Sequence, residues 1–351
     1  FLNKDRYFYL RLHGMFINRK EELKMKQKLT ALLLILTIVF TVCACSGGAS
    51  SGKPDSARKY KIAIVQLVDN SAFSEMIDAF KSKMNELGYT SENASFDIKN
   101  AQGDMSTLNS ICADLKNSDY DLIVPIVTPA AQAVVNAEVS APVVFISVTS
   151  PVGAGIMTSM ESPDKNATGT SNIVPVDEIF SLAKKLTPDA SNIGILYCPG
   201  EKNAVLTVEK AKAYLENNNY SYTEVTVASS GDVQQAAQSL ATKVDAIYVP
   251  IDSTVQSAME QVTAAATENH IPVYGSDPVM VKSGALACVS VSNTQLGQQS
   301  AEMADKVLKG TAVADIPAVA LTDYQYVVNS GTADSLGITV PEIDGLVKMG
   351  K

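Results

Sequence analysis

From Lys61 onward, short runs of consecutive apolar residues alternate with segments whose apolar residues recur at helical spacing. The runs Lys61–Val68, Tyr120–Thr128 and Pro142–Thr149 are apolar on both faces, which is typical of strands buried within a parallel sheet. Ile77–Leu87 and Leu108–Leu115 carry apolar residues three or four positions apart, as amphipathic helices do. This alternation predicts an α/β fold in which helices cover a parallel sheet.

A second series of the same kind begins near Val176. Its expected strands are Asn192–Tyr197, Tyr222–Ala228, Val244–Ile251 and Ile271–Gly275. The two series also resemble each other, because Asp121–Thr128 can be laid on Asp245–Asp252 and a glutamine follows at the same offset, Gln132 and Gln256. This weak repeat predicts two doubly wound lobes, each built around its own parallel sheet.

The expected lobes are each made of two stretches of chain. We expect lobe 1 to comprise residues 59–170 and 291–325, and lobe 2 to comprise residues 171–290 and 326–351. The chain would cross between them near Thr170–Pro175, and the helix Leu296–Leu308 would return to lobe 1. Ligands of doubly wound sheets bind at the carboxyl ends of the strands, so the expected site is a cleft between the lobes.

Charge and histidine content narrow the possible functions. Residues 1–44 hold 8 Lys/Arg and 3 Asp/Glu, which leaves 20 basic and 34 acidic residues, a net charge of −14, for 45–351. An acidic body is a poor partner for a phosphate backbone, so we expect no nucleic-acid partner. Only His13 and His270 are present. Two histidines remove most histidine-based metal chemistry and Ser-His-Asp catalysis. We expect no metal site and no cofactor.

The amino-terminal region is typical of an export signal. Lys24, Lys26 and Lys28 precede the uncharged apolar run Leu29–Val42, which ends at Cys43-Ala44-Cys45. Fourteen residues fall short of the roughly 20 that a membrane-spanning helix needs, so a transmembrane anchor is not expected. Because Met25 opens a complete signal peptide, we interpret residues 1–24 as a spurious upstream extension and residues 25–44 as the signal peptide.

The sequence around Cys45 resembles a bacterial lipobox, in which the cysteine is lipidated and becomes the new amino terminus. Cys45 fits better than Cys43, since the small residue Ala44 precedes it. The alternative is an ordinary secretory cleavage that leaves both thiols unmodified. In the lipoprotein interpretation, residues 45–58 form a lipidated cysteine and a flexible tether. The remaining cysteines, Cys112, Cys198 and Cys288, are far apart and are expected to be buried thiols.

Two of the expected strand ends carry complementary chemistry. On lobe 1, Thr128-Pro129 suggests a helix that Thr128 caps, with free N–H groups of Ala130 and Ala131 forming an anion site for a carboxylate. Asp252 occupies the matching place on lobe 2 and could bind an ammonium group. For both residues the alternative is a helix cap alone, Asp252 capping a helix at Thr254–Thr267. Together the two positions match the two ends of an amino acid.

Other candidates lie on neighbouring strand-end loops, where turn formation or core packing is the competing interpretation. They are Asn70 and Ser71 after the first strand, Thr149 and Ser150 after Pro142–Thr149, Tyr197 and Asn203 around the start of the helix that follows Tyr197, and Asp277 after Tyr274. We expect no catalytic residue, because no convincing set of nucleophile, base and activated water is present. The absence of a Walker-type GKS/T sequence indicates that this chain does not hydrolyse ATP.

Several segments are similar to the substrate-binding lipoproteins of ABC importers, in the branch whose characterised members take tryptophan or tyrosine. The resembling segments are Thr128–Ala133, Phe145–Pro151, Thr168–Ser171, Leu196–Asn203 and Val249–Val255, within a match that runs from about Lys61 to Asn329. The resemblance implies the type I periplasmic-binding fold, in which three crossovers join two lobes. The sequence departs from that family's pattern at Ser150, where Asp is usual, at Cys198, where Asn is usual, and at Asp69-Asn70-Ser71, in place of Glu-His-Pro.

The expected function is that of an extracytoplasmic solute-binding lipoprotein. The chain would bind an L-amino acid, with an aromatic side chain such as that of Trp, Tyr or Phe, and deliver it to an ABC permease. It would act as a monomer anchored to the cell membrane through the lipid on Cys45. The alternatives are a lipid-anchored sensor subunit for a signalling receptor, or a binding protein for a different small polar solute.

Overall fold

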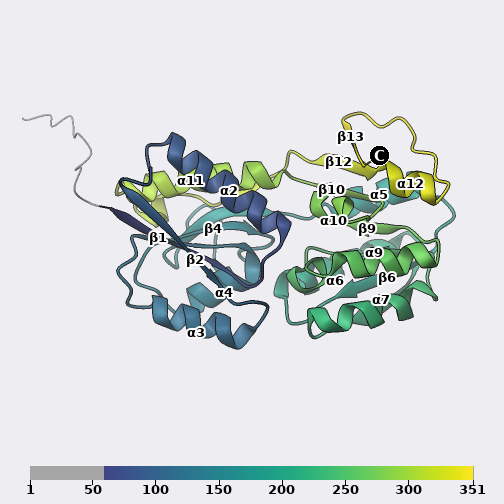
Figure 1. Cartoon of the computed structure of the whole chain (residues 1–351), viewed down its shortest axis with the longest axis horizontal. Coiled ribbons are helices and arrows are strands. Elements are labelled where there is room, and N and C mark those ends of the chain that lie inside the picture. The colour runs from purple at the N-terminus through teal and green to yellow at the C-terminus, as the bar shows by residue number, and fades with distance from the viewer. Residues whose placement is uncertain (1–58, 351) are drawn as a thin grey trace, which may run out of the picture. The chain divides into compact units, whose positions relative to one another are not determined.

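The computed structural model describes residues 59–350, which form two α/β lobes (Figure 1). Lobe 1 is built on a sheet of six strands in the order β11-β5-β4-β3-β1-β2. The strands are β1 (Tyr60–Gln66), β2 (Ala94–Asn100), β3 (Leu122–Pro125), β4 (Val143–Val148), β5 (Ala167–Asn172) and β11 (Val319–Leu321). Their pairings are parallel, and their carboxyl ends therefore lie along one edge of the sheet.

Two layers of helices cover the sheet of lobe 1 (Figure 1). The helices α2 (Ser71–Glu86) and α11 (Asn293–Leu308) pack on the face that carries Ile62 and Ile64 of β1, and α3 (Met105–Leu115) and α4 (Val127–Asn136) pack on the opposite face. Gly297 lets α11 approach α2 closely, because a Cβ atom there would lie 2.3 Å from the carbonyl oxygen of Met76.

Lobe 2 is built on a sheet of seven strands in the order β13-β12-β10-β9-β8-β6-β7. The strands are β6 (Asn192–Tyr197), β7 (Ser221–Thr226), β8 (Ala246–Tyr248), β9 (Val273–Gly275), β10 (Ala287–Ser290), β12 (Gln325–Asn329) and β13 (Leu346–Met349). All pairings are parallel except that β12 runs antiparallel to β10, where the chain re-enters the lobe.

The helices of lobe 2 also form two layers. The apolar residues of α5 (Val176–Leu186), α6 (Lys202–Asn217) and α12 (Ser330–Ser335) belong to the core on one face of the sheet. Those of α7 (Val233–Ala241), α8 (Ser253–Gln256), α9 (Met259–Glu268) and α10 (Pro278–Lys282) contribute to the core on the other. Each lobe therefore has the doubly wound arrangement that the sequence predicts.

The chain passes between the two sheets three times. The passages are residues 173–175 between β5 and α5, residues 291–292 between β10 and α11, and residues 322–324 between β11 and β12. The α/β fold class, with two parallel-sheet lobes joined by three crossings, is confirmed. Two short 3-10 turns, Ser230–Asp232 and Val313–Asp315, complete the described elements.

Some predicted boundaries are wrong. The expected helix Thr254–Thr267 is two helices, because the helical hydrogen bonding stops at Gln256 and resumes at Met259. The expected strand Tyr120–Thr128 ends at Pro125, since α4 already begins at Val127. The predicted signal peptide, Cys45 and the tether lie outside the described residues. Within residues 59–350, no helix is both long and apolar enough to cross a membrane.

Candidate functional site: buried polar groups at the strand ends

The first loop of lobe 1 places Asn70 at the amino end of α2. Its side-chain oxygen accepts a hydrogen bond from the N–H of Phe73 at 3.0 Å, so Asn70 is the N-cap of the helix. The side-chain nitrogen of Asn70 is buried and has no hydrogen-bond partner. Ser71, the first residue of α2, is exposed. Asn70 therefore offers a free donor beyond its capping role.

The geometry at Thr128 differs from the predicted cap. The N-cap of α4 is Ile126, which has no side-chain capping bond, and Val127 has a φ of 58°. The left-handed turn at Val127 starts the helix before Thr128. Ala130 and Ala131 then lie far enough along the helix for their N–H groups to bond to backbone carbonyls four residues earlier, so the prediction that they are free is wrong.

The helix start leaves a different set of donors. The N–H groups of Val127 and Thr128 have no acceptor within the helix, because they lie in its first turn. The hydroxyl group of Thr128 is fully buried and has no partner. These three donors belong to the first turn of α4, where the helix macrodipole favours negative charge. An anion site on lobe 1 that uses these donors, in place of Ala130 and Ala131, stays a prediction.

Thr149 and Ser150 follow β4 and line a cavity of about 420 Å³. The wall is completed by residues of both lobes: Pro151, Val152, Met160, Glu161, Ser171, Ile173, Lys210, Ala318 and Ala320. The Thr149 hydroxyl oxygen is buried without a partner. Lys210 belongs to α6 of lobe 2, so this cavity opens between the lobes and combines hydroxyl groups with apolar side chains.

In lobe 2, Asp252 and Glu201 form a buried pair of carboxyl groups. Asp252 is 0% exposed and Glu201 is 3% exposed. Asp252 caps α8 by accepting from the N–H of Val255 at 2.9 Å, and it also accepts from the N–H of Cys198 at 2.6 Å. Burial, then the negative charge of Glu201, raises the pKa of Asp252 well above its usual value. The ammonium contact expected of Asp252 stays a prediction.

Asn203 and Gln256 add two more unpartnered groups to lobe 2. The side-chain nitrogen of Asn203 donates to the carbonyl of Ile251 at 2.7 Å, whereas its side-chain oxygen is buried without a partner. The side-chain nitrogen of Gln256, at the end of α8, is likewise buried and unpartnered. An acceptor and a donor are thus available on the two loops that Asp252 and Glu201 join.

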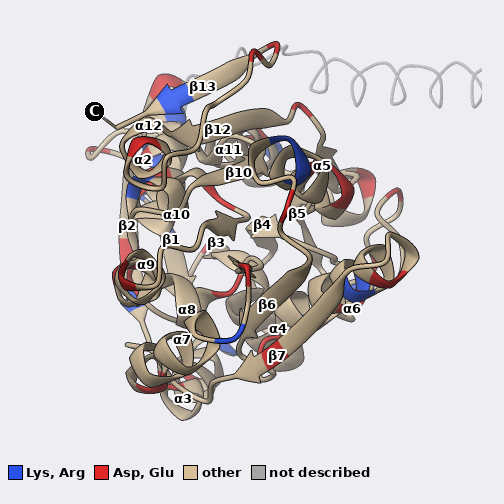
Figure 2. Ribbon diagram, turned by 90° about the vertical axis from the view of Figure 1, so that its right-hand side faces the viewer, with Lys and Arg blue, Asp and Glu red and all other residues tan. Residues whose placement is uncertain are grey.

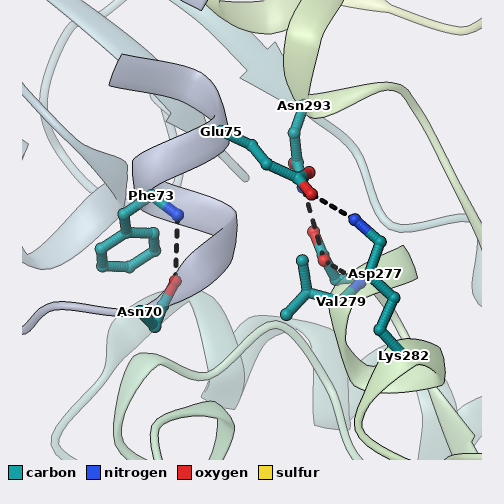
Figure 3. A network of polar contacts seen from close by, with 7 residues as sticks. All are labelled: Asn70, Phe73, Glu75, Asp277, Val279, Lys282 and Asn293. Atoms are coloured by element: carbon teal, nitrogen blue, oxygen red, sulfur yellow. Dashed lines mark hydrogen bonds and ion pairs between the residues drawn. The ribbon is translucent and has the colours of Figure 1, made fainter. Parts of the chain in front are cut away.

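A polar network crosses from lobe 1 to lobe 2 beside Asn70 (Figure 3). Glu75 of α2 forms an ion pair with Lys282 of α10, and the side-chain nitrogen of Asn293 lies 3.4 Å from Glu75 and 3.5 Å from Asp277. Asp277 caps α10 by accepting from the N–H of Val279 at 2.8 Å. Because Asp277 is buried, its pKa is raised to about 6.

Tyr197, the last residue of β6, lies apart from these groups. Its hydroxyl group donates to Glu224 of β7 at 3.1 Å, near the edge of the sheet. Desolvation and this hydrogen bond raise the pKa of Tyr197. Its phenol is therefore engaged with β7 in this structure, and an aromatic ligand contact by Tyr197 stays a prediction.

The unpartnered polar atoms have a common location. Within residues 59–350, buried side-chain atoms without a hydrogen-bond partner occur in Gln66, Asn70, Thr128, Thr149, Asn192, Asn203, Gln256 and Asn293. Except for Asn192, at the amino end of β6, they all lie at or just beyond the carboxyl ends of strands. Leaving a buried polar group unpaired costs about 1–3 kcal/mol, so such a concentration points to a surface that is completed by a ligand.

Sequence analysis found part of this set. Asn70, Thr128, Thr149 and Asn203 were expected from their places after strands, whereas Gln66, Gln256 and Asn293 were missed. For Gln256 a signal was available, because it is half of the glutamine pair in the internal repeat. Gln66 ends an apolar strand and Asn293 begins a helix, and neither place distinguishes a ligand contact from an ordinary polar residue.

These features define a two-lobed ligand-binding protein, and comparison with known proteins places it in a family. Residues 61–347 match the model of the ABC transporter substrate binding protein family. The chain belongs to this family, and the resemblance inferred from its sequence is confirmed. The type I periplasmic-binding fold that the resemblance implies is confirmed as well.

Three known proteins are similar to this chain over most of its length. The tyrosine-binding protein of Clostridioides difficile (strain R20291) is 36% identical over 313 residues, covering 88% of this chain and 91% of the relative. The crystal structure of the ABC domain from Streptococcus pneumonia in complex with L-Trp has a TM-score of 0.79 and 32% identity, covering 82% of this chain and 100% of that one. The ligand-free, open structure of a substrate-binding protein with adhesive properties from Clostridium difficile has a TM-score of 0.63 and 36% identity. The match covers 83% of this chain and 99% of that one.

Proposed function

We propose that this protein is the extracytoplasmic binding component of an ABC importer, which takes up an aromatic L-amino acid between its lobes and delivers it to a membrane permease. The observation that carries the proposal is the set of buried, unpartnered polar atoms at the carboxyl ends of the strands in both lobes. An amino acid supplies both donors and acceptors to such groups, and closure of the lobes around it would satisfy both sets at once.

The expected contacts divide according to the chemistry each can offer. On lobe 1, the N–H groups of Val127 and Thr128 and the Thr128 hydroxyl are donors suited to the α-carboxylate. On lobe 2, the side-chain oxygen of Asn203 is a free acceptor suited to the ammonium group. Asn70 and Thr149 offer further polar contacts, and the apolar part of the cavity beside Thr149 suits an aromatic ring.

Two relatives support the choice of ligand class. One is a tyrosine-binding protein and the other was crystallised with L-Trp, and both cover more than four fifths of this chain. The departures at Ser150 and at Asp69-Asn70-Ser71 lie on strand-end loops, so they bear on which aromatic side chain is preferred.

The lipid anchor is a separate part of the proposal. We propose Cys45 as the lipidated residue, which would hold the protein at the extracytoplasmic face of the membrane. Mass spectrometry of the amino-terminal peptide from membranes should show an acylated cysteine at position 45. The Cys45→Ala variant should be released from the membrane fraction, whereas Cys43→Ala should behave as the wild type.

Calorimetric titration of residues 46–351 tests the ligand class. L-tyrosine, L-tryptophan and L-phenylalanine are the probes, and each should give saturable binding at one site if it fits. Tyramine lacks the carboxylate and 3-(4-hydroxyphenyl)propionate lacks the ammonium group, so both should bind more weakly than L-tyrosine. If L-tyrosine, tyramine and 3-(4-hydroxyphenyl)propionate bound with equal affinity, the two charged ends would not be recognised. That result would refute the proposed contacts.

A further inference from the structure

Two loops of lobe 2 exchange hydrogen bonds through their carboxyl groups. The loop between β6 and α6 carries Cys198 and Glu201, and the loop between β8 and α8 carries Asp252 and Ser253. Asp252 accepts from the N–H of Cys198 at 2.6 Å, and Glu201 accepts from the N–H of Ser253 at 2.9 Å. Each loop therefore supplies both a carboxyl group and an N–H group to the other.

Glu201 also completes the cap of α8. It accepts from the N–H of Thr254 at 2.8 Å and from the Thr254 hydroxyl at 2.9 Å, while Asp252 accepts from the N–H of Val255. All these donors are neutral. No lysine or arginine among residues 59–350 forms an ion pair with either carboxyl group. Figure 2 shows basic positions of lobe 2 on β13, α5 and α6.

Two buried carboxyl groups without a cation cannot both ionise at low cost. Burial and the charge of Glu201 hold the pKa of Asp252 well above its usual value, and a hydrogen bond with Glu201 acts in the same direction. The other titratable group facing the pair is the Cys198 thiol, whose pKa burial also raises. Asp252 is the carboxyl whose pKa is raised, so a proton retained by this buried pair would reside on Asp252, with Glu201 as its acceptor.

The tied loops carry two of the three unpartnered polar groups of lobe 2 within residues 59–350, the third being Asn192 at the amino end of β6. Asn203 lies two residues after Glu201, and its side-chain nitrogen bonds to the carbonyl of Ile251, the residue before Asp252. Gln256 ends the short helix α8 that the two carboxyl groups cap. The positions of these two side chains therefore depend on the hydrogen bonds between the loops.

We propose that Glu201 and Asp252 are positioning residues that share one proton, and that this proton holds Asn203 and Gln256 in place for the ligand. Loss of the proton would leave two negative charges in contact, separate the loops and weaken ligand binding. The proposal rests on the proposed function only in assigning Asn203 and Gln256 to ligand contacts. The shared proton itself follows from the pair and its surroundings.

Two conservative variants perturb the contacts of the pair. Asp252→Asn keeps one oxygen that can accept from the N–H of Val255 and gains N–H groups that can donate to Glu201, but it loses the second oxygen, which accepts from the N–H of Cys198. Glu201→Gln also keeps only one acceptor oxygen. In the wild type, the N–H of Ser253 donates to one oxygen of Glu201 and the N–H of Thr254 donates to the other. Each variant therefore removes one acceptor from the contacts between the loops, and neither retains the shared proton.

Infrared spectroscopy of the ligand-free protein, residues 46–351, tests the proton directly. The wild type at pH 7 should show the C=O band of a protonated carboxylic acid. This band should be missing from the spectrum of Asp252→Asn. Absence of this band from the wild type would overturn the proposal. This result does not depend on any ligand, so it remains decisive even if the protein binds no amino acid.

Calorimetry with L-tyrosine tests the positioning role. Asp252→Asn and Glu201→Gln should each lose at least about tenfold in affinity, one decade of Kd, because each loses one hydrogen bond between the loops. The affinity of Asp252→Asn should stay flat between pH 6 and about 8.5, and that of the wild type should fall wherever the infrared band is lost with rising pH. A wild-type affinity that does not change over the pH range in which the band is lost would refute the positioning role while leaving the proposed function intact.

Discussion

Replacing Thr128 by valine should separate folding stability from ligand binding. The Thr128 hydroxyl is fully buried in lobe 1 and has no hydrogen-bond partner. Valine has nearly the same shape and removes the unpaired polar group. Because an unsatisfied buried group costs about 1–3 kcal/mol, the free energy of unfolding of ligand-free Thr128→Val should rise by about 1 kcal/mol or more.

The same substitution should weaken ligand binding. If the hydroxyl donates to the α-carboxylate, the lost hydrogen bond to a charged group is worth about 1.5–3 kcal/mol, which raises Kd at least about tenfold. Urea unfolding measures the first effect, and calorimetry with L-tyrosine measures the second. A variant that is more stable and binds less well is the expected combination.

Thr168 provides the matched control. It is equally buried in the same lobe, but its hydroxyl donates to the carbonyl of Ile316 at 2.7 Å. Thr168→Val should therefore lower the free energy of unfolding by about 1–3 kcal/mol and leave the affinity unchanged. If Thr128→Val behaved in the same way as this control, or bound L-tyrosine as tightly as the wild type, the assignment of Thr128 to the ligand would be refuted.

Three further substitutions test the surroundings of the site. Because the pKa of Asp277 is raised to about 6, this group lowers the free energy of unfolding by about 3 kcal/mol as pH rises from about 4 to 6. Asp277→Asn should remove this pH dependence in urea titrations at several pH values. An unaltered pH dependence would contradict the assignment. Gly169→Ala should lower the free energy of unfolding by at least about 2 kcal/mol, because its Cβ would lie 2.1 Å from the carbonyl oxygen of Phe145; an unchanged urea midpoint would count against this packing. Lys282→Ala should weaken L-tyrosine binding by less than about 1 kcal/mol in calorimetry, since its ion pair with Glu75 across the lobes is partly exposed, and a larger loss would show a stronger role in closure.

The sequence predicts the architecture well because hydrophobic periodicity is a local signal. The strand Asn192–Tyr197 has the predicted bounds, and the other strands of the two series were found with differences at their ends. The start of α4 was predicted incorrectly, because a positive φ at a β-branched residue such as Val127 is not encoded in any local preference. Thr128-Pro129 suits the first turn of a helix whichever residue caps it.

The chemistry of the site depends on long-range contacts that the sequence does not reveal. Glu201 lies 52 residues from Ser253, to which it bonds, and nothing in the local pattern pairs the two loops. Asp252 was expected to face the ligand, whereas the structure surrounds it with backbone N–H groups and a second carboxyl. Residue type and strand-end position identify the candidates, but only the fold shows which polar atoms are left without partners.

The absence of tryptophan from the chain makes a bound ligand easy to detect. Added L-tryptophan would be the only indole present, so a change in its fluorescence reports its own environment. A saturable change that L-tyrosine reverses would place both amino acids at one site. A change that L-tyrosine leaves untouched would mean that the two do not share a site.

A crystal structure of the protein grown with L-tyrosine would test the central claim most directly. The account predicts one amino acid between the lobes, with hydrogen bonds to the atoms that now lack partners in Asn70, Thr128 and Asn203. A bound amino acid located elsewhere, or one that left those three side chains unpaired, would contradict the account.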